Sequence, residues 1–166
     1  CDMAPFGFQW FSLLNRSEKN LLDGIKIVEP ILNDFIDEQL DRFGLADKDL
    51  LVIGFSQGTM LSLHAILRRE KTIAGLLGYS GALVAPHLLK DEIKSRPEIC
   101  LVHGEEDEIV PFSAFNDALS VFQKLGIPVN GYSAKDLGHG IDPAGMKIGV
   151  EFAQNIFNAS KTKKVS

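Results

Sequence analysis

Short apolar runs recur along this chain and are separated by longer segments of mixed polarity. The runs lie at Leu50–Ile53, Ile73–Tyr79 and Ile99–Val102. Runs of this length with few polar residues are typical of strands buried on both faces of a sheet. The sequence therefore predicts strands at these three runs, and a fourth strand at the more polar stretch Val129–Ser133.

The segments between these runs carry apolar residues at helical spacing. We expect helices from Ser17 to Gly44, from Gln57 to about Arg69, from about Ser113 to Leu125, and from about Pro143 to Asn158. Strands that alternate with helices favour right-handed parallel crossovers, and hence an α/β fold with a doubly wound, mostly parallel sheet. No repeat or linker divides the chain, so we expect a single domain over residues 1–166.

Composition is that of an ordinary globular domain and narrows the possible partners. The chain has 166 residues, of which 45% are hydrophobic and 23% charged. The net charge of −5 offers no basic surface for nucleic acid or an anionic membrane. The one basic run, residues 161–164, is expected to be a solubilising tail, and no apolar run is long enough to span a bilayer.

Two cysteines, Cys1 and Cys100, do not make a disulfide framework. Cys100 lies in an apolar run, where a thiol behaves as a small hydrophobic group. We therefore expect a reducing compartment, the cytoplasm.

The pentapeptide at residues 54–58 reads Gly-Phe-Ser-Gln-Gly and stands where the run Leu50–Ile53 meets a predicted helix. A serine between glycines at such a junction favours a sharp turn that presents the Ser56 hydroxyl above the sheet. We expect both Gly54 and Gly58 to be required, because a Cβ atom at either position would clash. The pattern alone also fits a chance loop, so the interpretation depends on a base and an acid further along the chain.

His139 is the histidine that best fits a general base and acid for Ser56. A serine hydroxyl is a poor nucleophile at neutral pH, so an imidazole must accept its proton and a carboxylate must orient that imidazole. His139 lies between two glycines, which suits a side chain on a loop that reaches into a site. The rivals fit less well: His64 points along the helix after Ser56, His103 ends a strand and is expected to make structural hydrogen bonds, and His87 lies in a connection.

The orienting acid is expected in the acidic cluster that follows the run Ile99–Val102. Asp107 is favoured because its short side chain precedes Ile109-Val110-Pro111, which is typical of a turn before a helix. Its rivals are Glu105, Glu106 and Glu108. All four acids also fit a solvated loop or a weak cation site.

Four motifs in order carry a resemblance to a known family. They are residues 54–60, Gly-Phe-Ser-Gln-Gly-Thr-Met; residues 78–81, Gly-Tyr-Ser-Gly; His103-Gly104 with Asp107 and Val110-Pro111; and residues 138–141, Gly-His-Gly-Ile. Together they resemble the phospholipase/carboxylesterase family of α/β-hydrolases, which includes bacterial carboxylesterases and acyl-protein thioesterases. The resemblance implies a Ser56, Asp107 and His139 triad and an oxyanion-hole donor at the Gln57 backbone N–H. The chain order serine, aspartate, histidine agrees with this fold.

The chain departs from this resemblance at its N-terminus. The resemblance implies a longer chain, with early strands and a loop that supplies a second oxyanion donor. The present sequence therefore resembles the C-terminal three quarters of the fold. We expect the fold to be N-terminally incomplete and the strand Leu50–Ile53 to leave one row of backbone groups unpaired on an apolar edge. Losing one such donor costs about 100- to 1,000-fold in turnover.

The function expected from these residues is serine hydrolysis of carboxylic esters or thioesters through an acyl-enzyme, without metal or organic cofactor. Lysophospholipids, acyl thioesters and simple esters all fit the same triad. The sequence does not indicate an oligomeric state. Trp10, Leu83 and Phe112 are expected near the acyl-binding surface, although such residues also fit the core. The alternative from another class is a non-catalytic hydrolase-like chain with a binding or assembly role.

Overall fold

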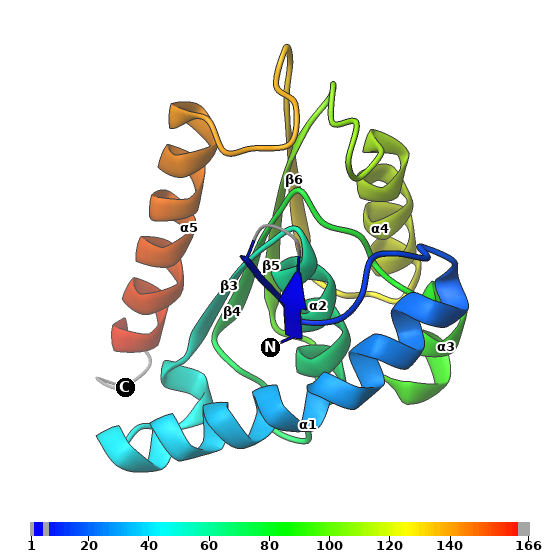
Figure 1. The fold of residues 1–166 in the computed structure, drawn as a ribbon. Helices are drawn as coiled ribbons and strands as arrows, with labels where there is room; N and C mark the ends of the chain where they lie inside the picture. The colour runs from blue at the N-terminus through cyan, green and yellow to red at the C-terminus, as the bar shows by residue number, and fades with distance from the viewer. Residues whose placement is uncertain (1, 5–6, 163–166) are drawn as a thin grey trace.

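The structure of the chain is a computed structural model that describes residues 2–4 and 7–162 (Figure 1). Cys1 and the end of the basic run, Lys163 and Lys164, lie outside the described residues. The elements in chain order are β1 (Asp2–Ala4), β2 (Gly7–Gln9), α1 (Glu18–Phe43), a 3₁₀ turn (Asp47–Asp49), β3 (Leu51–Phe55), α2 (Gln57–Arg68), β4 (Gly75–Tyr79), α3 (Pro86–Glu92), β5 (Glu98–Gly104), α4 (Phe112–Lys124), β6 (Val129–Ala134) and α5 (Pro143–Thr162).

The main sheet has four parallel strands in the order β3-β4-β5-β6. Its register pairs Phe55 of β3 with Tyr79 of β4, and Gly104 of β5 with Ala134 of β6. The carboxyl ends of all four strands therefore meet at one edge of the sheet. The loops that follow them carry Ser56, Asp107 and His139.

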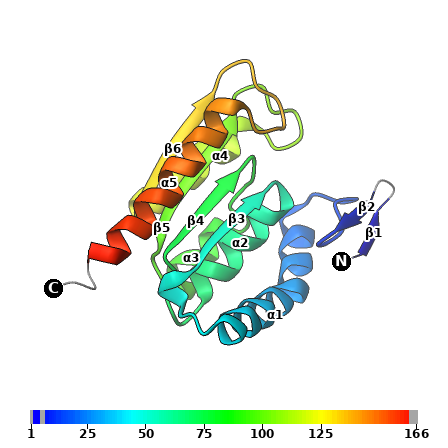
Figure 2. The same ribbon diagram turned by 90° about the vertical axis from the view of Figure 1, so that its left-hand side faces the viewer.

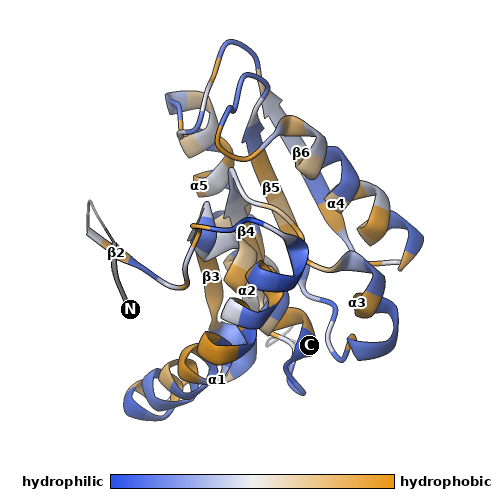
Figure 3. Ribbon diagram, turned by 45° about the vertical axis from the view of Figure 1, so that its right-hand side comes forward, coloured by the Kyte–Doolittle hydropathy of each residue, from blue (hydrophilic) through white to orange (hydrophobic). Residues whose placement is uncertain are grey.

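Helices cover both faces of this sheet (Figure 2). On one face, Ile148 and Phe152 of α5 pack against a buried cluster from β4 and β5 that includes Tyr79 and Val102. On the other face, α1, α2 and α4 pack around a larger core that includes the fully buried side chains of Phe122 and Ile66. Figure 3 shows the strands β3 and β5 coloured mainly as hydrophobic residues, and β5 is buried along nearly its whole length, as expected for a strand between helices. The predicted α/β class with a parallel sheet is confirmed.

Local signals at the ends of α1 agree with its predicted limits. The Ser17 hydroxyl accepts a hydrogen bond from the Asn20 N–H, which satisfies one of the free donors of the first turn. Gly44 closes the helix with a φ of 63°, a left-handed conformation that glycine adopts without strain. Pro30 is accommodated inside the helix.

Two parts of the fold differ from the sequence-based expectation. The region around Pro86 was expected to be a connection, but it forms α3, with Pro86 in the first turn, where its missing N–H costs nothing. The N-terminal segment forms an antiparallel hairpin in which Met3 pairs with Phe8, a pairing too short to give a strand pattern in the sequence.

β3 is the edge strand of the sheet within the described residues, because it pairs with β4 alone. Its side chains Ile53 and Phe55 are 60% and 42% exposed, respectively. An apolar strand therefore forms one border of the sheet.

Candidate active site

Ser56 lies in the turn between β3 and α2 and has an unusual backbone conformation. Its φ is 53° and its ψ is −115°, a combination that costs energy for a residue with a Cβ atom. Two backbone hydrogen bonds hold it: the Ser56 N–H donates to the Tyr79 carbonyl at 2.9 Å, and the Ser56 carbonyl accepts from the Met60 N–H at 3.1 Å. This is the strained strand-to-helix turn that the sequence predicts.

The glycines around this turn are not equally required. A Cβ atom on Gly54 would lie 2.6 Å from the Thr59 nitrogen, and one on Gly81 would lie 2.3 Å from the Thr59 Cβ. The expectation that Gly58 must also be glycine is wrong, because a Cβ atom there would meet nothing within 4 Å. Gly58 is on the first turn of α2, where that direction is open.

Asp107 and His139, which are far apart in the sequence, are brought into direct contact. The His139 Nδ1 lies 2.8 Å from Asp107 Oδ2, so the imidazole donates to the carboxylate through this nitrogen. The other oxygen, Oδ1, accepts from the N–H groups of Ile109 and Val110, both at 2.9 Å. The Asp107 side chain has no exposed surface, whereas the His139 side chain is 19% exposed.

These contacts keep Asp107 charged inside the protein. Burial by itself would raise the pKa of the Asp107 carboxyl, but the hydrogen bonds from His139 and from the Val110 and Ile109 N–H groups outweigh it and hold the pKa below its ordinary value. A carboxylate held in this way fixes the imidazole with its proton on Nδ1 and leaves Nε2 free to accept another.

His103 makes a further contact with Asp107. Its Nε2 donates to the Val110 carbonyl at 2.9 Å and lies 3.4 Å from Asp107 Oδ2. The ring is buried against Phe112 and Phe115. His103 therefore supports the loop that carries Asp107, in keeping with a structural hydrogen-bonding role.

The residue before Ser56, Phe55, contacts His139. The rings of Phe55 and His139 are in contact, with centroids 4.9 Å apart. The loop after β6 is tied to the sheet by the Ser80 hydroxyl, which donates to the Gly140 carbonyl at 3.2 Å. The hydrogen bonds of the described residues do not include one between the Ser56 hydroxyl and His139, and such bonds are often long in unliganded enzymes.

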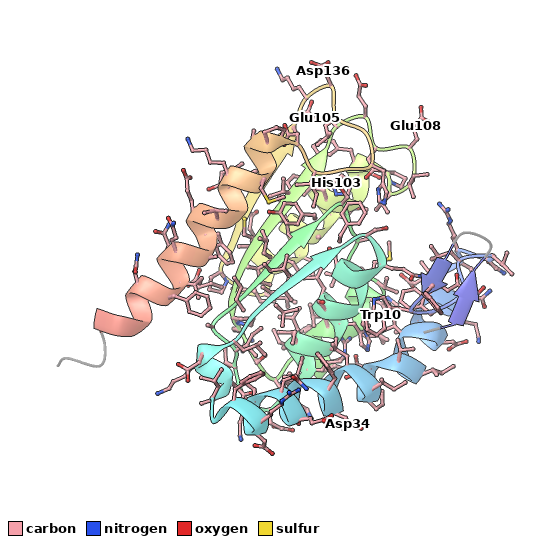
Figure 4. All side chains as sticks on the ribbon, turned by 60° about the vertical axis from the view of Figure 1, so that its left-hand side comes forward. Trp10, Asp34, His103, Glu105, Glu108 and Asp136 are labelled. Carbon is pink, nitrogen blue, oxygen red and sulfur yellow. The ribbon has the colours of Figure 1, made fainter. Side chains whose placement is uncertain are left out.

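The rival side chains lie elsewhere or face solvent. His64 is buried in α2, with its Nε2 3.3 Å from Glu29 Oε2. His87 is 62% exposed. In the acidic loop, Glu105 accepts from the Ser133 hydroxyl at the surface, and Figure 4 shows Glu105 and Glu108 at the outer end of the sheet.

Of the three residues expected near an acyl group, one lines a cavity with Ser56. A cavity of about 410 Å³ is bordered by Trp10, Ser56 and Gln57, together with apolar side chains of α1, α2 and β3. Figure 4 shows Trp10 beside α2 and the N-terminal hairpin. Leu83 and Phe112 instead pack against the main core, and they are not among the residues that line this cavity.

Two kinds of feature, a cluster of metal ligands and a membrane-spanning helix, are not found among the described residues. No group of three or more His, Cys, Asp or Glu side chains in residues 2–4 and 7–162 is arranged to hold a metal ion. No helix in the same part of the chain is long and apolar enough to cross a bilayer.

A parallel sheet that carries a strained serine turn and a buried aspartate–histidine pair at its carboxyl edge defines the α/β-hydrolase class. Residues 2–156 match the model of the family described as Phospholipase/Carboxylesterase. This chain belongs to that family.

Individual relatives agree with this assignment. The chain is 29% identical over 147 residues to acyl-protein thioesterase 1 of Gibberella zeae, covering 86% of this chain and 61% of the relative. It is 24% identical to esterase YpfH of Escherichia coli, covering 89% of this chain and 62% of the relative. The chain thus spans about six tenths of the length of these curated relatives.

Solved structures share the fold. The crystal structure of esterase PE8 superposes with a TM-score of 0.87 at 32% identity, covering 92% of this chain and 72% of that one. SOBER1 of Arabidopsis thaliana superposes with a TM-score of 0.74 at 23% identity, covering 90% of this chain and 74% of that one, which is a likeness of fold.

Proposed function

We propose that this chain carries the catalytic triad of a serine hydrolase that cleaves carboxylic esters or thioesters. The observation that carries the proposal is the hydrogen bond between His139 and the buried Asp107, at the sheet edge where Ser56 occupies its strained turn. The family assignment supports the same class of reaction, since similar proteins are named esterase and acyl-protein thioesterase.

In the proposed cycle, the Ser56 oxygen attacks the acyl carbonyl while Nε2 of His139 takes the hydroxyl proton. Asp107 holds the imidazole through Nδ1 and stabilises the imidazolium that forms. The tetrahedral intermediate collapses as His139 gives the proton to the departing alcohol or thiol. Water, deprotonated by His139, then hydrolyses the acyl-enzyme and restores Ser56.

The backbone of Gln57 supplies one stabilising group in this scheme. Gln57 is the first residue of α2, and the first N–H groups of a helix have no partner within it. The N-terminal end of the helix also carries partial positive charge. An N–H there is suited to hold the oxyanion that develops on the substrate.

The substrate class follows from the lining of the Ser56 cavity. Leu32, Val52 and Leu61 border it beside Trp10, so the acyl part of the substrate is apolar. Simple carboxylic esters, acyl thioesters and lysophospholipids all present such a group next to a carbonyl. The apolar lining selects for the acyl part of the substrate, which all three classes share, and does not select among their leaving groups.

Steady-state kinetics on the full-length natural protein test the proposal, with p-nitrophenyl acetate and an acyl thioester as substrates. Ser56→Ala and His139→Gln are expected to lower kcat by at least about 1,000-fold, since triad members act as one unit. His87→Gln, which alters an exposed histidine, should leave kcat unchanged. Full activity in Ser56→Ala would overturn the proposal, and no turnover in the unaltered protein would favour a non-catalytic binding role.

A further inference from the structure

The side chain of Gln57 binds the backbone of a segment that is distant in the sequence. Its Oε1 accepts from the Trp10 N–H at 2.9 Å, and its Nε2 donates to the Phe11 carbonyl at 2.6 Å. One amide thus binds a backbone group of each of two consecutive residues. Both bonds cross 46 or more residues of sequence, so they fix tertiary structure and not a local turn.

Phe11 gives this segment a firm anchor. Its side chain is 3% exposed and belongs to a core cluster with Ile25 and Met60. Gly24 of α1 makes room for it, because a Cβ atom at Gly24 would lie 2.7 Å from the Phe11 Cβ. The Gln57 amide therefore joins the first turn of α2 to a segment that is already seated on α1.

Trp10, the residue before Phe11, is only partly buried. It borders the cavity of about 410 Å³ that Ser56 also lines. A cavity of this size is suited to a small organic group. Phe11 points into the core, whereas Trp10 lies on the cavity wall. The position of the indole therefore depends on how the backbone at residues 10 and 11 is held, and Gln57 binds the N–H of the first residue and the carbonyl of the second.

We propose that the Gln57 side chain is a positioning residue that fixes Trp10 as a wall of the acyl site and so sets the preference for acyl length. This inference rests on the proposed function and concerns the side chain of Gln57, in addition to the backbone N–H assigned above. The side chain makes no contact with the reacting atoms and acts through Trp10.

The kinetic test compares p-nitrophenyl acetate with p-nitrophenyl octanoate in the full-length natural protein. Gln57→Met keeps the length of the side chain and removes both hydrogen bonds. We expect the octanoate-to-acetate ratio of kcat/KM to fall by about tenfold, mainly through a higher KM for octanoate, because apolar contacts with the longer chain are lost. Gln123→Met makes the same change at an exposed position of α4 and should leave the ratio unchanged.

A double-mutant cycle asks whether the effect passes through Trp10. Trp10→Ala should lower the same ratio, and adding Gln57→Met to it should lower the ratio no further, because residues that act through one contact are not additive. If Gln57→Met does not fold, Gln57→Glu takes its place: it keeps the acceptor for the Trp10 N–H and loses the donor to Phe11. Fully additive effects would overturn the proposal.

Fluorescence tests the same contact without turnover, because Trp10 is the single tryptophan of the sequence. In folded Gln57→Met, acrylamide should quench the indole more strongly than in the unaltered protein, and Gln123→Met should not differ. An unchanged quenching constant, or increased quenching with an unchanged acyl ratio, would overturn the proposal. If Ser56→Ala retained activity while quenching rose in Gln57→Met, the proposed catalytic role would fail and the contact would stand.

Discussion

His139 Nδ1 lies 2.8 Å from Oδ2 of Asp107, a carboxylate with no exposed surface. The remaining oxygen of Asp107 is occupied by two backbone N–H groups of its own loop. The carboxylate therefore cannot turn toward solvent, and the imidazole that binds it has one orientation.

Asp107→Asn tests the importance of this charge. An asparagine amide is nearly the same size but has no negative charge, and its NH₂ group favours the wrong imidazole tautomer. We expect kcat to fall by about 10³- to 10⁴-fold with little change in KM. Steady-state ester hydrolysis measures this, and Asp117→Asn on the exposed side of α4 is the matched control. A loss of less than tenfold in a folded Asp107→Asn protein would contradict the assigned role.

The two glycines of the serine turn provide a matched pair of stability variants. Gly54→Ala places a Cβ atom 2.6 Å from the Thr59 nitrogen, which belongs to backbone that cannot move aside cheaply. We expect it to lower the free energy of unfolding by about 1–3 kcal/mol. Gly58→Ala meets open space, and alanine is the better helix former, so stability should be unchanged or raised by up to about 1 kcal/mol.

Urea denaturation of both alanine variants measures these differences. Equal destabilisation by Gly54→Ala and Gly58→Ala would show that the close approach at Gly54 does not have the described geometry.

His64 gives the protein a pH-dependent stability unrelated to the site. Burial, with a further contribution from nearby Arg68, lowers the pKa of His64 to about 4 from the ordinary 6.5. The ring lies 3.3 Å from Glu29, and its Nδ1 has no hydrogen-bond partner among the described residues. The unfolded chain therefore binds more protons than the folded one between pH 6.5 and about pH 4, and stability should fall as the pH is lowered through this window.

Glu29 acts in the opposite direction. Burial raises the pKa of its carboxyl, so the folded protein takes up this proton more readily and gains some stability in acid. Urea unfolding at about pH 7 and about pH 5 measures the combined effect of His64 and Glu29 on the free energy of unfolding. The protonation of histidine in the unfolded chain changes strongly between these two pH values. The loss between the two should be smaller in His64→Gln than in the unaltered protein, and His87→Gln, at an exposed position, should behave as the unaltered protein. An equal loss in His64→Gln would remove His64 as the cause.

Much of the fold follows from the sequence because its signals are local. Apolar runs located β3, β4 and β5, and Ser17 and Gly44 marked the ends of α1. The strand expected at Val129–Ser133 also forms, as β6, although most of its residues are exposed. The hairpin of β1 and β2 and the helix α3 were missed, since three-residue strands and a seven-residue helix are too short for a periodic pattern.

The residues of the site were also predictable where their signals are local, and their contacts were not where distant segments meet. Ser56 could be found from its flanking strand and helix, and His139 from its glycine-rich loop. The pairing of Gln57 with the backbone at residues 10 and 11 arises only when distant segments meet. No spacing along the chain predicts it. The open direction at Gly58 likewise depends on the path of α2.

Covalent labelling by a fluorophosphonate, followed by peptide mass spectrometry of the full-length natural protein, tests the central claim most directly. A serine activated by His139 should take up one phosphonyl group on Ser56, and Ser56→Ala should abolish labelling while Ser113→Ala on exposed α4 does not. Labelling of a different residue, or labelling that continues undiminished in Ser56→Ala, would contradict the account.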